Sequence, residues 1–108
     1  MKLLEVAHAR SGDKGDTCNI SVIAFDAADY DFIRTHLTTQ RVRHHFGHMV
    51  AGKVERFEVP RVGALNFVLY DALSGGVNRS LALDAHGKCL GSILLEIDMP
   101  SRETEAGR

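Results

Sequence analysis

The sequence has few cysteines, little net charge and no long hydrophobic run. Its two cysteines, Cys18 and Cys89, have neither the spacing of a zinc site nor that of a redox pair. The formal net charge is −1, and no run of lysine or arginine exceeds two residues, which argues against nucleic acid or an anionic membrane as partner. No segment is apolar for long enough to span a bilayer, and the amino terminus lacks the pattern of a signal peptide. Together with two isolated thiols, these absences favour a reducing compartment, and we expect a cytoplasmic protein.

The composition is that of an ordinary globular domain. Hydrophobic residues make up 44% and charged residues 25% of the 108 residues, a length close to the commonest domain size. Such a chain can bury one modest core without a disulfide or a metal. We therefore expect a single domain over residues 1–98. Residues 99–108 are mostly polar and are expected to form a flexible tail.

Alternation of apolar and polar residues predicts three strands in the first half of the chain. Residues 3–8 and 19–25 have the period of a strand. Residues 53–59 repeat this pattern until Pro60 ends it. Between the first two strands, residues 10–17 contain two glycines and two aspartates, which are typical turn residues. We expect a wide polar loop there.

Helical spacing predicts helices elsewhere. Residues 27–46 follow Asp26, a candidate N-cap, and Thr38 can cap a second short helix that Gly47 ends. Residues 63–73 give the strongest helical pattern, with one apolar stripe made of Leu65, Val68, Leu69 and Ala72.

The remaining segment predicts a hairpin, with strands over residues 79–83 and 89–98. The order strand, strand, helix, strand, helix, strand, strand indicates an α+β fold with one sheet and helices on one face. The other face of the sheet would be exposed to solvent or used for self-association.

The segment from Ser11 to Thr17 is the strongest candidate for chemistry. Its glycines allow backbone N–H groups to approach an anion, and Arg10 and Lys14 would add positive charge. Asp13 and Asp16 would repel a phosphate unless they are paired, and they could instead bind a hard cation. A capped turn whose aspartates accept bonds from their own backbone is the simplest alternative. The candidate ligand-binding residues in this region are His8, Arg10, Ser11, Asp13, Lys14, Asp16 and Asn19.

Two further polar residues, Asn66 and Arg79, are candidates for ligand binding, whereas the thiol of Cys18 is not expected to take part in chemistry. Arg79 follows a glycine pair and could bind an anion, although a surface ion pair is the simpler interpretation. Asn66 is placed on the solvated side of the helix predicted over residues 63–73. His8 precedes the polar loop and is the best candidate for a general base. Cys18 is expected to be a buried, inert thiol.

Three histidines raise the possibility of a metal site. His44 and His48 would share a helix face, but Gly47 interrupts that helix and no acidic or thiol ligand lies nearby in sequence. We therefore predict no metal and no cofactor.

Five blocks of the sequence form a recognisable set: His8-Ala-Arg-Ser-Gly-Asp-Lys-Gly-Asp16, Asn19-Ile-Ser, Arg41-Val, Gly63-Ala-Leu-Asn-Phe-Val-Leu69 and Gly75-Gly-Val-Asn-Arg-Ser-Leu81. Over about residues 3–97 the sequence with these blocks resembles a known family, the AtuA-like ferredoxin-fold domain. This domain is found at the C-terminus of acyclic terpene utilisation proteins of the AtuA type, or as a small separate protein. It implies a ferredoxin-like α+β fold, with a mainly antiparallel sheet, and association with a larger AtuA-type protein in bacterial acyl-CoA and terpenoid breakdown. The name of the fold carries no implication of iron–sulfur chemistry.

Three functions remain open on this basis. The first is an accessory subunit that contributes the polar loop to a shared site for an acidic or CoA-linked ligand. The second is a stand-alone lyase or hydratase, in which His8, Asp13 or Asp16 acts as base and Arg10, Lys14 and Arg79 hold the substrate. The third is a structural domain that assembles through its sheet. For any of them we expect a homodimer or higher homo-oligomer.

Overall fold

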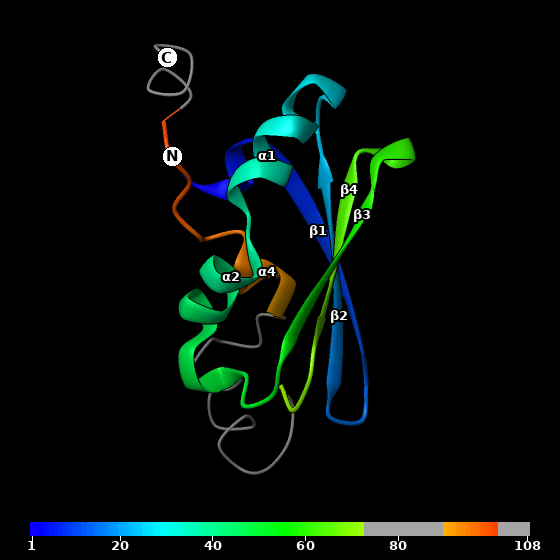
Figure 1. The fold of residues 1–108 in the computed structure, drawn as a ribbon, viewed down its shortest axis with the longest axis vertical. Helices are drawn as coiled ribbons and strands as arrows, with labels where there is room; N and C mark the ends of the chain where they lie inside the picture. The colour runs from blue at the N-terminus through cyan, green and yellow to red at the C-terminus, as the bar shows by residue number, and fades with distance from the viewer. Residues whose placement is uncertain (73–89, 102–108) are drawn as a thin grey trace.

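The computed structural model of the protein describes residues 1–72 and 90–101 (Figure 1). In this part of the chain an antiparallel sheet forms one layer, and short helices pack on one of its faces. The strands are β1 (Ala7–Lys14), β2 (Thr17–Ala24), β3 (Val54–Val59) and β4 (Ala64–Leu69). The α-helices are α1 (Tyr30–His36), α2 (Thr39–Phe46) and α4 (Leu90–Leu94), and the 3-10 turns are η1 (Leu3–Glu5), η2 (Ala27–Asp29), η3 (Gly47–Met49) and η4 (Pro60–Val62). The predicted α+β architecture is confirmed.

The sheet joins two hairpins through its centre. The strand order is β1-β2-β4-β3, and all neighbouring strands are antiparallel. The central strands β2 and β4 belong to different hairpins, so their pairing holds together segments more than 40 residues apart. β1 and β3 form the two edges of the sheet.

The wide loop predicted over residues 10–17 is wrong. β1 continues to Lys14 and β2 begins at Thr17, and these two residues pair across a turn of only two residues. Gly15 opens that turn with a φ of 63°, a conformation that glycine adopts without steric cost. The other turn-type residues fit into the strand because β1 is an edge strand and this half of it is exposed. The first strand also begins later than predicted, at Ala7, because residues 3–5 form η1.

The helix predicted over residues 63–73 is also wrong, because this segment contains β4. Leu65, Phe67 and Leu69 alternate along the strand and are fully buried against the helices. The same run fits a helical stripe, since a short apolar segment satisfies both periods. β4 is a central strand with hydrogen-bonded neighbours on both sides, and this tertiary pairing decides its conformation.

The strand predicted over residues 89–98 is wrong in its described part, because residues 90–94 form α4 and residues 95–96 form a turn. Leu94 and Ile97, three residues apart, are both buried in the core. After them the chain forms a single bridge between Asp98 and Lys2, whose side chains also form an ion pair of 3.1 Å. The partner strand predicted over residues 79–83 lies outside the described residues.

The helices predicted over residues 27–46 are confirmed, with their caps. The Asp26 carboxylate accepts a bond from the backbone N–H two residues on, at 2.9 Å. The Thr38 hydroxyl accepts one from the backbone N–H three residues on, at 3.2 Å. Gly47 ends α2 with a φ of 58°.

The core lies between the sheet and the helices. Its largest fully buried side chains come from every layer: Phe46, Phe67, Leu3, Ile20, Ile33, Leu37, Leu65, Leu69, Leu94, Val22 and Val42. Arg56 reinforces the contact at one edge, because its guanidinium on β3 donates to the backbone carbonyls of Arg34 and Leu37 at the end of α1. Figure 1 shows the helices gathered on one side of the four strands.

Candidate functional site

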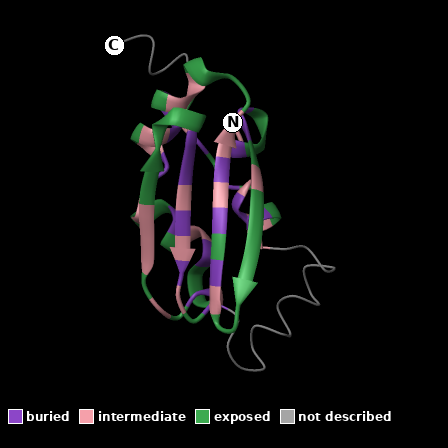
Figure 2. Cartoon of the chain, turned by 90° about the vertical axis from the view of Figure 1, so that its right-hand side faces the viewer, coloured by how far each residue is buried: buried purple, intermediate pink, exposed green. Residues whose placement is uncertain are grey.

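One face of the sheet is not covered by any described element, and we call it the open face (Figure 2). On β2, Cys18, Ile20 and Val22 point toward the helices and are buried, so the residues between them project from the open face. On β4, Leu65 and Phe67 are buried in the same way, whereas Asn66 and Val68, which alternate with them, are half-buried. Directly paired residues of antiparallel strands project from the same face, so the register determines which side chains meet there.

One row of directly paired residues crosses all four strands at the centre of the open face. Arg10 on β1 pairs with Ser21 on β2, Ser21 pairs with Asn66 on β4, and Asn66 pairs with Phe57 on β3. We call these four residues the cross-strand row. Two polar residues thus occupy the two central strands, with a cation at one end and an aromatic ring at the other.

The middle of the cross-strand row is held by a hydrogen bond. The Ser21 hydroxyl donates to Oδ1 of Asn66 at 3.2 Å, and both side chains are half-buried. This bond orients the amide, so the Nδ2 amino group has its two N–H donors available. Among the described residues nothing accepts from that amino group.

Two cations project from the same face of β1. Arg10 and Lys14 are exposed, are four residues apart on the strand, and have no ion pair with any residue that the structure describes. Asp13, which lies between them, projects from the opposite face because it pairs with the buried Cys18. The hairpin formed by residues 10–19, which we call the polar hairpin, therefore presents its positive charges to the open face. One of its aspartates projects from the other face.

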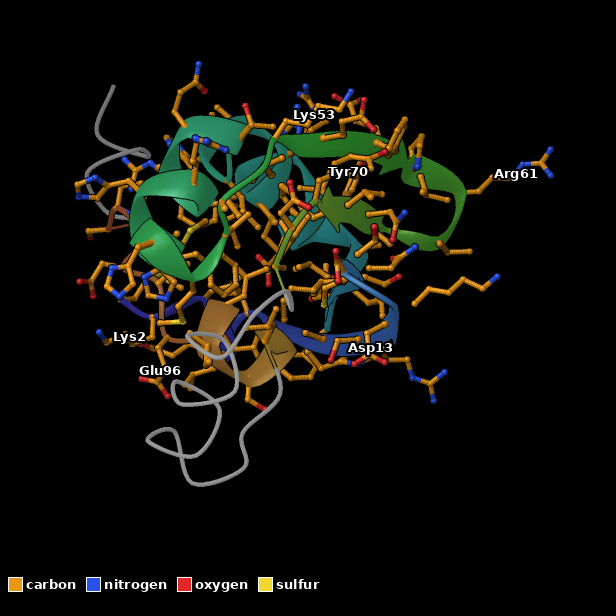
Figure 3. All side chains as sticks on the ribbon, turned by 90° about the horizontal axis from the view of Figure 1, so that it is seen from below. Lys2, Asp13, Lys53, Arg61, Tyr70 and Glu96 are labelled. Atoms are coloured by element: carbon orange, nitrogen blue, oxygen red, sulfur yellow. The ribbon has the colours of Figure 1, made fainter. Side chains whose placement is uncertain are left out.

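A paired cluster occupies the opposite edge of the sheet. Lys53 contacts Glu55 at 3.3 Å and lies over the ring of Tyr70, whose hydroxyl donates to Glu55 at 2.9 Å. The bond from Tyr70, with the nearby Lys53, lowers the pKa of Glu55 below its ordinary value. The same bond to the carboxylate raises the pKa of Tyr70. Figure 3 shows Lys53 and Tyr70 together at this edge, with Asp13 at the other.

Apolar side chains are exposed around the cross-strand row. Phe57 is 49% exposed and Val59, two residues on along the same face of β3, is 38% exposed. Phe25, directly after β2, is 64% exposed, and its ring stacks on His8 of β1 with centroids 5.5 Å apart. Exposed aromatic residues that gather on one face are unusual for a surface that faces only water.

The fold brings together part of the predicted site. Arg10, Asn66 and Asn19 lie on the open face in adjacent rows, although Asn66 was assigned to the outer side of a helix. His8 and Lys14 lie on the same face, toward its two ends. The other predicted residues lie elsewhere. Ser11 projects toward α4, where a Cβ added to Gly91 would lie 3.2 Å from the serine hydroxyl. Asp13 projects from the helix-bearing face, Asp16 is in the turn, and Arg79 lies outside the described residues.

Ser21 and Phe57 were not among the site residues predicted from the sequence. The signal for Ser21 was present, since a serine between isoleucine and valine in a predicted strand indicates a face that differs from the core face. Phe57 was placed correctly on a strand, but its pairing with Asn66 depends on a register that cannot be derived from local pattern.

Comparison with protein families gives a match that spans nearly the whole chain. The family model of the AtuA ferredoxin-like domain matches residues 1–100. The chain belongs to this family. Comparisons with curated proteins and with solved structures give no match. The sheet with helices packed on it agrees with a ferredoxin-like α+β domain.

In the described part of the AtuA ferredoxin-like domain, two cavities lie beside α2, and neither includes a residue of the cross-strand row. One of about 410 Å³ is lined by α2 and the start of β3, including Arg43 and Lys53. The other, of about 380 Å³, is lined by α2 and residues 97–98 and includes His44 and His45. Over residues 1–72 and 90–101, no three side chains of the metal-ligating types cluster in a way that could hold an ion.

Two further features follow from the described residues of the AtuA ferredoxin-like domain. Cys18 is 3% exposed within the core, which confirms that this thiol is buried. None of the described helices has both the length and the apolar character needed to cross a membrane.

Proposed function

We propose that this AtuA ferredoxin-like domain is an accessory subunit that binds a larger AtuA-type protein through its open face. The setting would be bacterial breakdown of acyclic terpenes or branched acyl-CoA compounds, in which such a partner carries the chemistry. The polar hairpin formed by residues 10–19 would contribute to the docking surface. One observation carries this proposal: the open face exposes aromatic and aliphatic side chains around a polar centre.

The exposed apolar area is large enough to contribute to binding. Phe57 is 49% exposed, which corresponds to roughly 100 Å² of a phenylalanine side chain. Covering that area would contribute about 2.5 kcal/mol at roughly 25 cal/mol per Å². Phe25, with 64% exposure, would contribute a similar amount. Aromatic residues of this kind commonly form the centre of a binding interface.

The arrangement of the polar groups also supports a docking surface. Interfaces combine an apolar area with a few polar residues that determine the orientation of the partners. The cross-strand row has this composition, with Arg10, Ser21 and Asn66 beside Phe57. All four are anchored on strands, so little ordering of the backbone is required on binding.

The test is co-purification with the AtuA-type chain of the same organism. The tagged wild-type domain should retain that chain, and the variant Phe57→Thr, which keeps a good strand residue, should retain it at least tenfold less. The matched control is Leu4→Thr, because Leu4 is 43% exposed but lies in η1, outside the sheet. Thermal unfolding would verify that both variants fold.

Two results would contradict the proposal. In the first, Phe57→Thr binds the AtuA-type chain as well as the wild type does. In the second, the isolated domain converts an acyl-CoA on its own, which would favour a stand-alone enzyme.

A further inference from the structure

The centre of the open face contains a residue that strand formation does not favour. Asn66 lies in the middle of a central strand, where asparagine is depleted because it packs poorly on a pleated surface. Its amide is oriented by Ser21, and its two N–H donors are not used by any described residue. A polar group that is held in place but has unused donors is suited to binding an acceptor from outside.

Arg10 adds more donors on the same row. Adjacent strands are about 4.8 Å apart, so the backbones of Arg10 and Asn66 lie roughly 10 Å apart, with Ser21 between them. A guanidinium has five N–H donors and no acceptor, and it binds carboxylates in a two-pronged geometry. Arg10 and Asn66 can therefore approach the same small group from its two sides. A carboxylate, which only accepts, fits this row better than a group that donates.

The charge on the open face selects the same kind of partner. Among the described residues of this face, Glu55 is paired with Lys53 and bonded to Tyr70, whereas Arg10 and Lys14 have no ion-pair partner. The unpaired charge is thus positive. A negatively charged partner surface would be attracted to Arg10 and Lys14. Burial under that surface would strengthen the ion pair between Arg10 and a partner carboxylate, because water is excluded.

The row lies on the surface of a sheet, beside the exposed ring of Phe57. A free carboxylic acid held there would leave one side in water, whereas a protein surface that covers Phe57 would enclose the carboxylate as well. We propose that Arg10 and Asn66 bind an aspartate or glutamate side chain of the AtuA-type partner, beside an apolar contact on Phe57. This inference rests on the docking function proposed above and names the chemistry of the partner's contact residue.

The test measures the affinity of the purified AtuA-type chain for variants of this domain at two salt concentrations. Arg10→Gln should weaken binding by at least about tenfold, because it leaves a carboxylate buried without its cation. Arg10→Lys should recover only part of that loss, since lysine cannot form the two-pronged contact. Asn66→Asp, which places a carboxylate where the amide donates, should weaken binding more than Asn66→Gln.

Arg61→Gln is the matched control, because it removes the same type of side chain and the same charge from an exposed position in η4, outside the cross-strand row and the polar hairpin. It should change affinity less than threefold, and mainly at low salt. Exchanging charges should restore binding: Arg10→Glu in this domain should bind a partner in which the contacting acid is replaced by lysine.

The outcomes separate this inference from the docking function. If Phe57→Thr weakens binding while Arg10→Gln and Asn66→Asp bind like the wild type, docking stands and the carboxylate contact is refuted. If the wild type does not bind the AtuA-type chain, both are refuted. If sodium acetate competes with the partner at submillimolar concentration, compared with sodium chloride at equal ionic strength, the site is one for free acids and the proposed occupant is wrong.

Discussion

Replacing Gly52 by alanine should destabilise this domain strongly, although the change adds a single methyl group. Gly52 precedes β3, and its backbone N–H donates to the carbonyl of Tyr70 at 2.9 Å. A Cβ at this position would lie 2.6 Å from that carbonyl oxygen and 2.8 Å from the Cβ of Tyr70. Both are closer than real contacts allow, and the nearest atoms belong to the backbone, so the start of β3 must move.

The expected change in the free energy of unfolding combines two destabilising contributions and one stabilising contribution. The clash of the added methyl group with the backbone of Tyr70 costs roughly 1–3 kcal/mol. Loss of the hydrogen bond from the Gly52 N–H costs about 1 kcal/mol more. Alanine restricts the unfolded chain and returns about 0.4–1 kcal/mol. The net loss in the free energy of unfolding should be about 1–3.5 kcal/mol. For a domain of this size, that corresponds to a fall in Tm of roughly 5–25 °C.

Thermal and urea unfolding of Gly52→Ala and Gly12→Ala would measure this effect. Gly12 is the matched control, because it lies in the exposed half of β1 and a Cβ there would meet nothing within 4 Å. Gly12→Ala should change the free energy of unfolding by less than about 1 kcal/mol. If the two variants have equal stability, the close approach of Gly52 and Tyr70 does not constrain β3.

Two further outcomes test the separation of the two sheet faces and the charge cluster at the edge. Phe67→Ala should lower the free energy of unfolding by about 3–5 kcal/mol, because Phe67 is fully buried. Phe57→Ala, on the open face, should lower it by less than about 1 kcal/mol. Equal losses in urea unfolding would contradict the assignment of the faces. The pKa of Glu55 is lower in the folded state, so its contribution to stability is present above the unfolded pKa and is lost as the pH falls through the folded pKa. A carboxyl NMR titration should therefore show Glu55 titrating below an ordinary glutamate, and Tyr70→Phe should move its pKa back upward.

The local features of the sequence were sufficient for several elements. The caps at Asp26 and Thr38 and the stop at Gly47 were predicted and are confirmed, because a cap depends on residues within one turn of the helix. The two-residue turn at residues 15–16 lies where glycine and aspartate indicated a turn, but the extent of the strands on each side was underestimated. The strands extend to the turn because residues 10–14 pair with residues 17–21, and this pairing overrides the turn propensity of the glycines and aspartates.

Segments whose pattern fits two structures were decided by tertiary contacts. The run containing Leu65, Val68 and Leu69 satisfies helical spacing, and Leu65, Phe67 and Leu69 satisfy strand spacing equally well. Pairing with β2 on one side and β3 on the other makes it a strand. The reverse holds for α4, where Gly91 and Leu94 were assigned to a strand but are buried at the three-residue spacing of a helix.

The sequence by itself determined the class of the fold, the family and the helix caps at Asp26 and Thr38, and it indicated Arg10 and Asn66 as candidate binding residues. Only the tertiary structure decided that Arg10 and Asn66 lie on the two sides of Ser21 and that Phe57 lies next to Asn66. The physical reason is strand register. A shift of one residue would move these side chains to the opposite face of the sheet, and register is determined by the packing of the whole core.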